Sequence, residues 1–258
     1  MYRLTGTTMR WLLFVVSILC VHAHASDVAK EKRWADQVVD AILDGEAVWL
    51  KADGHEFLTI YTEAETDSSK GIIVVHGTGV HPDWEQVVKP VRVEMITRGW
   101  HTLSIQVPIL HNEASYEEYV PLYPEVPARF QAAEQFFKSR GIEKIVVVAH
   151  SQGATMAAYH LANSKHSIQA FVAVGVQATQ QDPHINAANS LTAINIPVLD
   201  LYGSEDLKGV LDTAQTRKLA STQNSGYAQQ VIRGAEHFFD DKNDELIEAI
   251  NGWLNSLN

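Results

Sequence analysis

The sequence predicts an α/β protein: a three-layer α/β/α sandwich built on one mostly parallel sheet, without a large lid domain. Short runs of β-branched residues alternate along the chain with amphipathic stretches of helical period. This alternation is typical of a parallel sheet with helices on both faces. The length of 258 residues and the hydrophobic content of 46% suit one compact core, and two independent domains would be cramped.

The expected elements follow one another in order. An early strand at 57–61 is expected to be antiparallel, and six more strands are expected at 72–75, 102–106, 145–149, 170–174, 198–202 and 229–232. Apolar residues three and four positions apart predict helices at 84–98, 126–140, 151–162, 210–221 and 243–257. Gly99 and Gly141 stand where two of these helices should end.

Two longer connections, 108–127 and 177–195, interrupt this rhythm. The first carries Tyr116, Tyr119 and Tyr123, and long ordered loops often have functional roles. We expect an aromatic rim or short lid over a fairly open pocket.

The first 25 residues have the pattern of an export signal. Arg3 and Arg10 precede an apolar run at 11–21 that is too short to span a bilayer, and Ala23-His24-Ala25 follows it. We expect cleavage after Ala25. This would leave one domain over 26–258 in the periplasm or outside the cell, with no stable membrane insertion. The alternative is an uncleaved amphipathic or membrane anchor.

Composition removes several classes of function. Cys20 is the only cysteine and lies within the predicted signal, so the mature chain would have no disulfide, thiolate metal site or cysteine nucleophile. Leu19 before it disfavours lipid attachment at this cysteine. The formal net charge is −11 and no basic run is present, so nucleic acid is not an expected partner.

The strongest local motif is the segment 146–154, in which a buried strand runs directly into a helix through Ser151. A serine at such a turn has a strained backbone, and the residues two before and two after it must be small. Ala149 and Gly153 meet this demand, with alanine in the first position of the usual G-x-S-x-G pattern. The segment predicts a nucleophile elbow, and the alternative is an ordinary helix N-cap serine.

The segment His76-Gly77-Thr78-Gly79 follows the strand at 72–75. Its glycines would let the backbone approach a developing oxyanion, which needs two N–H groups aimed at one point. We expect these donors to be the backbone N–H groups of Thr78 and Gln152. His76 is expected to brace the loop. No G-K-[ST] or G-x-G-x-x-G pattern is present, so nucleotide binding is not supported.

An acid and a base follow in the expected chain order. Asp206 comes after the strand at 198–202 and would orient a histidine, with Glu205 as the adjacent competitor. Asp200, inside that strand, is expected to be structural. His237 is the only histidine after Asp206 and completes the order serine, aspartate, histidine. The neighbouring His150 is expected to point away from the site.

These motifs together resemble the α/β-hydrolase superfamily over nearly all of the mature chain. The resemblance implies Ser151 as nucleophile, Asp206 as acid, His237 as base, and Thr78 and Gln152 as oxyanion donors. The chain is also similar to a group of exported bacterial α/β-hydrolases without an assigned substrate, in which a strand like 103–108 follows an early His-Gly loop.

The resulting hypothesis is a serine hydrolase that cleaves a small carboxylic ester or related acyl bond through an acyl-enzyme, without metal or cofactor. Two alternatives remain. One is a non-catalytic envelope protein that uses the same fold for binding, and the other is an acyltransferase that passes the acyl group to an alcohol or amine.

Overall fold

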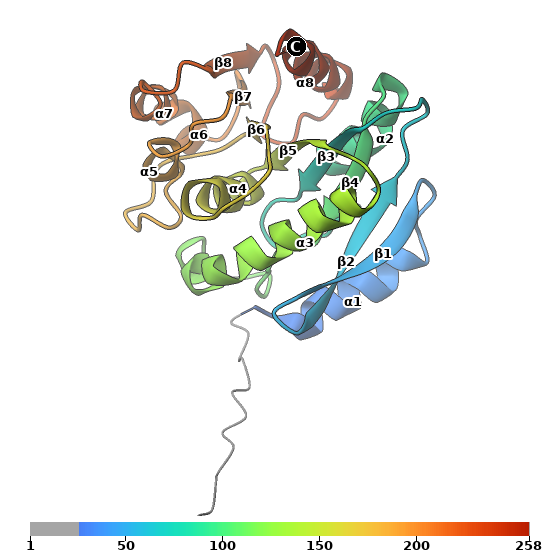
Figure 1. Ribbon diagram of the computed structural model, residues 1–258. Coiled ribbons are helices and arrows are strands. Elements are labelled where there is room, and N and C mark those ends of the chain that lie inside the picture. The colour runs from blue at the N-terminus through green and yellow to red at the C-terminus, as the bar shows by residue number, and fades with distance from the viewer. Residues whose placement is uncertain (1–25, 258) are drawn as a thin grey trace, which may run out of the picture.

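The computed structural model describes residues 26–257 and has a three-layer α/β/α architecture (Figure 1). Its sheet has eight strands in the order β1-β2-β4-β3-β5-β6-β7-β8. β2 is antiparallel to both neighbours, and the other pairs are parallel. The strands are β1 Glu46–Ala52, β2 His55–Thr62, β3 Lys70–Val75, β4 His101–Ile105, β5 Lys144–His150, β6 Ala170–Val174, β7 Val198–Gly203 and β8 Tyr227–Ile232. The helices are α1 Val28–Val39, α2 Val88–Glu94, α3 Val126–Ser139, α4 Gln152–Asn163, α5 Ala187–Leu191, α6 Lys208–Asp212, α7 Ala214–Ala220 and α8 Asn243–Ser256, with 3₁₀ helices at Met95–Arg98 and Glu117–Glu125.

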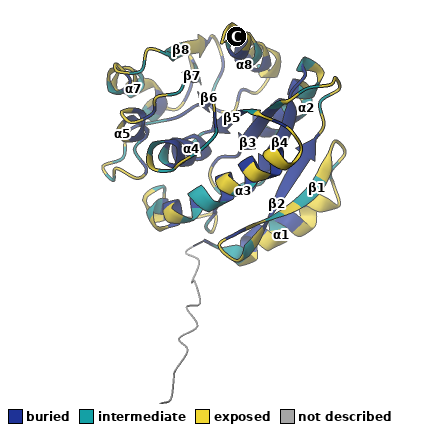
Figure 2. Cartoon of the chain, viewed as in Figure 1, coloured by how far each residue is buried: buried dark blue, intermediate teal, exposed yellow. Residues whose placement is uncertain are grey.

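Alternate side chains of the central strands enter two separate cores. In β3, Ile73 and Val75 join the core beneath α3 and α4, while Ile72 and Val74 join the core beneath α2 and α8. All four side chains are buried, as the dark strands of Figure 2 show. Because successive side chains of a strand face opposite sides, a strand covered on both faces has a continuous apolar sequence. This explains why β3 and β5 are predictable.

The predicted strands are all present, and their ends differ from the predicted ends by at most two residues. The strand at 57–61 is antiparallel, as predicted. β1 was not predicted. It is an edge strand whose residues are mostly exposed or half-buried, and its short apolar run 47–50 lies between Glu46 and Lys51.

The helices agree less closely. The predicted helix 84–98 begins only at Val88, because Val87 has a φ of +60°, and the predicted helix 210–221 is divided at Thr213 into α6 and α7. α1 and α5 were not predicted: half of the α1 residues are polar, and α5 has only 5 residues. Gly99 and Gly141 follow helix ends with positive φ, as predicted.

The two long connections build no further domain within residues 26–257. The connection 108–127 contains the 3₁₀ helix Glu117–Glu125, and 177–195 contains α5, which packs against α4. Within the described chain, every helix is too short or too polar to cross a bilayer. The predicted signal peptide, residues 1–25, lies outside the described residues.

Candidate active site

Ser151 lies at the sharp turn between β5 and α4. Its φ of 54° is in the left-handed region, which is costly for a residue with a side chain by about 1–3 kcal/mol. The hydrogen bond from its N–H to the carbonyl of Val174 (2.8 Å) helps to hold this conformation. A Cβ atom at Gly153 would lie 2.1 Å from the carbonyl oxygen of His76, so only glycine fits there. The turn therefore has the conformation expected of a nucleophile elbow.

Ser151, His237 and Asp206 form a hydrogen-bonded row. Nε2 of His237 lies 3.0 Å from Oγ of Ser151, and Nδ1 lies 2.7 Å from Oδ1 of Asp206. The Asp206 carboxylate also accepts the N–H groups of Gly203 (3.2 Å) and Leu207 (2.7 Å). With the His237 proton on Nδ1, Nε2 is free to accept the serine proton. The structure thus brings together the three residues predicted as nucleophile, acid and base.

Burial distinguishes Asp206 from its neighbour. Asp206 and His237 are buried, whereas Glu205 is exposed. Asp200 is structural, as predicted. Its carboxylate accepts hydrogen bonds from Nε and Nη2 of the buried Arg217, at 2.7 and 3.2 Å.

A residue that sequence reasoning missed also holds His237. Gly175 follows β6 with a φ of +60°, and a Cβ atom there would lie 3.0 Å from both Cε1 and Nδ1 of His237. The imidazole ring therefore packs directly on this glycine. The sequence signal that could have identified Gly175 is its position directly after a buried strand.

The predicted oxyanion donors belong to two segments beside Ser151, the start of α4 and the loop 76–79. Gln152 is the first residue of α4, and N–H groups in the first turn of a helix have no intrahelical acceptor. The other side is the loop 76–79, where a Cβ atom at Gly77 would be 3.3 Å from Cβ of Ser151. Thr78 lies on this loop and is exposed. This arrangement places the loop against the elbow.

His76 braces this loop, in agreement with the prediction. It is fully buried, donates from Nδ1 to the Gly77 carbonyl (2.8 Å), and accepts the Val107 N–H at Nε2 (3.1 Å). Burial lowers its pKa to about 3, so the ring is neutral at ordinary pH.

The expectation for His150 is wrong. Its ring does not point away from the site but lies 4.8 Å from the ring of His237, and its Nε2 donates to the His237 carbonyl (3.0 Å). The reason is that β5 ends beneath the loop carrying His237, so a side chain leaving the strand at His150 meets that loop. Burial, followed by the nearby His237, lowers the pKa of His150 to about 3.

The predicted aromatic rim is mostly wrong. Tyr119 and Tyr123 are buried, because the 3₁₀ helix that carries them turns them into the core beneath α3. Tyr116 is half-buried, and its hydroxyl bonds to Oγ1 of Thr155 (2.7 Å). His160 is also buried, and it stacks on Phe130.

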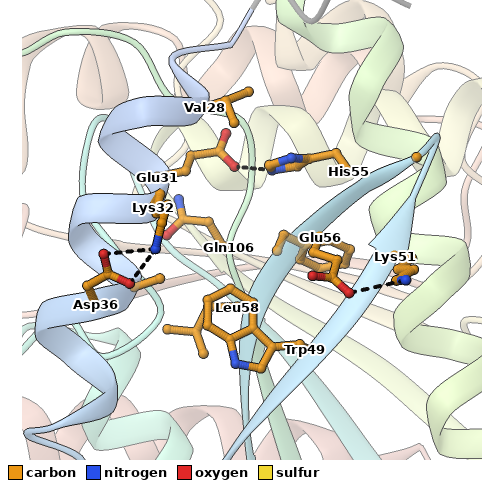
Figure 3. A pocket seen from close by; sticks show the side chains of 13 residues that line it. Val28, Glu31, Lys32, Asp36, Trp49, Lys51, His55, Glu56, Leu58 and Gln106 are labelled. Atoms are coloured by element: carbon orange, nitrogen blue, oxygen red, sulfur yellow. Dashed lines mark hydrogen bonds and ion pairs between the residues drawn. The ribbon is translucent and has the colours of Figure 1, made fainter.

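A hollow of about 720 Å³ lies between α1 and the β1–β2 hairpin, away from the elbow (Figure 3). Its lining includes the half-exposed Trp49 and the buried Leu58, with ion pairs such as Lys32–Asp36 along its edges. None of the residues of the hydrogen-bonded row lines it.

Among the described residues, no group of three or more His, Cys, Asp or Glu side chains is placed to hold a metal ion.

Comparisons with known proteins agree with this architecture. The model of a family described as "Protein of unknown function (DUF3530)" matches residues 22–123 and 121–256. No curated protein matches the sequence.

Solved structures show the same fold at low sequence identity. Est1E from Butyrivibrio proteoclasticus is 14% identical over 81% of this chain and 98% of its own, with a TM-score of 0.62. The Pyrococcus furiosus esterase Pf2001 is 16% identical over 86% and 94%, with a TM-score of 0.67. An esterase domain from Rhodothermus marinus is 12% identical over 81% and 96%, with a TM-score of 0.61. The fold is therefore that of the α/β hydrolases.

Proposed function

Because the chain belongs to the family described as protein of unknown function (DUF3530) and has the α/β-hydrolase fold, we propose that it is a serine hydrolase of carboxylic esters. The observation that carries this proposal is the row from Ser151 through His237 to Asp206, with spacings of 3.0 and 2.7 Å. This arrangement gives each group a role that ester cleavage needs.

The reaction would begin when Nε2 of His237 accepts the proton of Ser151 and Oγ attacks the ester carbonyl carbon. The oxyanion would bind the backbone N–H groups of Gln152 and Thr78. The tetrahedral intermediate then collapses, the bond to the alcohol oxygen breaks, and the proton passes from His237 to the leaving alcohol. Water, activated in the same way, releases the acid and regenerates Ser151.

Asp206 would orient the base. Its carboxylate accepts hydrogen bonds from N–H groups of His237, Gly203 and Leu207, which hold it in place. It would keep the His237 proton on Nδ1 and stabilise the imidazolium that forms during attack.

The ester class is supported by similarity to proteins of the same fold. The Pyrococcus furiosus and Rhodothermus marinus structures are named as an esterase and an esterase domain, and Est1E is described with bound ferulic acid. The proposed reaction needs no metal or cofactor.

Hydrolysis of short 4-nitrophenyl esters tests the proposal. Ser151→Ala should lower kcat by at least about 10³-fold, whereas Ser256→Ala, at the exposed end of α8, should not change it. Product analysis in the presence of alcohols distinguishes release of the free acid from acyl transfer. Equal rates for Ser151→Ala and the wild type would contradict the proposed nucleophile.

The proposed cell compartment is the periplasm or the exterior, on the basis of the signal-like residues 1–25. The mature protein should then begin at Ser26. N-terminal sequencing of the exported chain checks this, and an exported chain that still begins at Met1 would contradict cleavage.

A further inference from the structure

Lys30 is a buried cation beside the loop 76–79. The residue is only 6% exposed, although lysine is rarely buried without a charged partner. Its Nζ donates to the carbonyl of Leu110 (2.7 Å). Within residues 26–257, no carboxylate forms an ion pair with this ammonium group. Burial is the main cause that lowers the pKa of Lys30, and the charges of Asp27 and Glu113 offset part of this lowering.

The Tyr119 hydroxyl points to the same place. A Cβ atom added at Gly79 would lie 3.5 Å from Nζ of Lys30 and 3.7 Å from Oη of Tyr119. The two groups are held on opposite sides of one residue, because the Leu110 carbonyl accepts from Lys30 and the Leu110 N–H donates to Tyr119. The phenol still has its own proton to donate. A positive donor and a neutral donor thus converge in front of Gly79.

This position is close to the proposed nucleophile. Gly77 lies against Ser151, and Gly79 is two residues further along the same loop, at most about 7 Å away. A substrate with its ester carbonyl at Ser151 can therefore reach Lys30 with a spacer of roughly three to six methylene groups.

Lys30 also borders a hollow of about 320 Å³ that Arg33 and His111 line as well. Two acids, Asp27 and Glu113, line it too, but both have partners. Asp27 caps α1 through the Lys30 backbone N–H (2.9 Å), and Glu113 lies 3.5 Å from Nδ1 of His111. Lys30 therefore borders the surface, and both acids act on it through space without forming an ion pair with it.

We propose that Lys30 and Tyr119 form a subsite for a carboxylate of the substrate, so that the enzyme prefers esters carrying a second, ionised carboxyl group. This inference rests on the proposed ester hydrolysis and adds the substrate class. A carboxylate there would accept charge-assisted hydrogen bonds from the ammonium group and a further bond from the phenol. The formal net charge of −11 disfavours anions elsewhere on the protein, so this local cation would provide the selectivity.

The test compares kcat/KM for charged and neutral esters of equal length. One series is monomethyl dicarboxylates from succinate to sebacate, set against methyl alkanoates. The other is acetate esters of ω-hydroxy acids, set against alkyl acetates. The wild type should prefer the charged ester at one or two lengths of one series. Lys30→Met should lower this preference at least about tenfold, while Lys30→Arg should retain part of it.

Lys32→Met is the matched control, because Lys32 lies on the same helix but is exposed and paired with Asp36. It should leave the preference for charged esters unchanged. An unchanged preference in a folded Lys30→Met variant would overturn the subsite, as would a wild-type preference for neutral esters at every length.

Calorimetry with the Ser151→Ala variant separates the subsite from the proposed reaction. The preferred monoester should bind this variant, and adding Lys30→Met should weaken binding about tenfold. Binding that depends on Lys30 without turnover by the wild type would contradict ester hydrolysis and keep the subsite. Turnover of neutral esters without Lys30-dependent binding or preference would contradict the subsite and keep ester hydrolysis.

Discussion

Nε2 of His150 donates a hydrogen bond of 3.0 Å to the backbone carbonyl of His237, and the two rings lie 4.8 Å apart. The residue before the proposed nucleophile thus holds the loop of the proposed base. Because Ser151 follows His150 directly, this bond ties the elbow to the loop that delivers Nε2 of His237 to the serine.

Replacing His150 should therefore lower activity without changing substrate binding. His150→Phe keeps an aromatic ring but removes the donor, and one lost hydrogen bond of about 1–1.5 kcal/mol corresponds to roughly a tenfold lower kcat. His150→Gln keeps a donor and should restore much of the rate. Steady-state kinetics with a soluble ester checks this. A kcat for His150→Phe equal to that of the wild type would show that the bond has no positioning role.

His76 and His150 should make the protein sensitive to acid. Burial lowers both pKa values to about 3 in the folded state, against an ordinary value of 6.5. Between these values the unfolded chain binds protons that the folded chain does not. The free energy of unfolding should therefore fall as the pH falls from 6.5 towards 3, by up to about 1.4 kcal/mol per pH unit for each histidine.

Urea unfolding of the wild type and His150→Gln at pH 7 and pH 5 measures this contribution. Acidification should destabilise the variant less than the wild type, since one of the two histidines is gone. Carboxylates affect both proteins alike and cancel in the comparison. Equal pH dependence in the two proteins would show that His150 is not held neutral by the fold.

Gly175 should be intolerant of a side chain. In Gly175→Ala the methyl group would lie 3.0 Å from the His237 ring, so the ring must shift away from Ser151. We expect kcat/KM to fall at least about 100-fold, because misplacing a catalytic group by about 1 Å has an effect of this size. Gly141→Ala is the control: its φ of +73° is equally strained, but no atom lies within 4 Å of the new methyl group.

Gly141→Ala should therefore lose some stability, by about 1 kcal/mol, and keep its activity. Similar loss of activity in both variants would mean that backbone strain, and not contact with His237, limits residue 175.

Arg217 should be important for stability. Its guanidinium group is buried against Asp200, whose carboxylate also accepts the hydroxyl of Tyr227 (2.6 Å). Arg217→Met leaves the Asp200 charge unpaired and should reduce the free energy of unfolding by about 3–5 kcal/mol. The double variant with Asp200→Asn should be less destabilised than Arg217→Met alone. Urea unfolding measures both, and a more severe loss in the double variant would contradict this account.

The sequence was most informative where function imposes a local pattern. The turn around Ser151 requires small neighbours, so Ala149 and Gly153 reveal it without knowledge of the fold. The buried strands were also predictable, because burial on both faces leaves continuous apolar runs.

Other features depend on contacts between distant residues and leave no such pattern. His150 and His237 are 87 positions apart, and Lys30 and Leu110 are 80 apart. β1 was missed because it is a half-exposed edge strand that depends on tertiary packing, whereas α1 has an amphipathic pattern that the sequence does show.

The most direct test of the central claim is labelling with a fluorophosphonate probe, which reacts with activated serines. We predict that the mature wild-type protein gains one label, that peptide mapping places it on Ser151, and that Ser151→Ala gains none. Absence of labelling in the folded wild type would contradict an activated serine and favour a binding protein on the same fold.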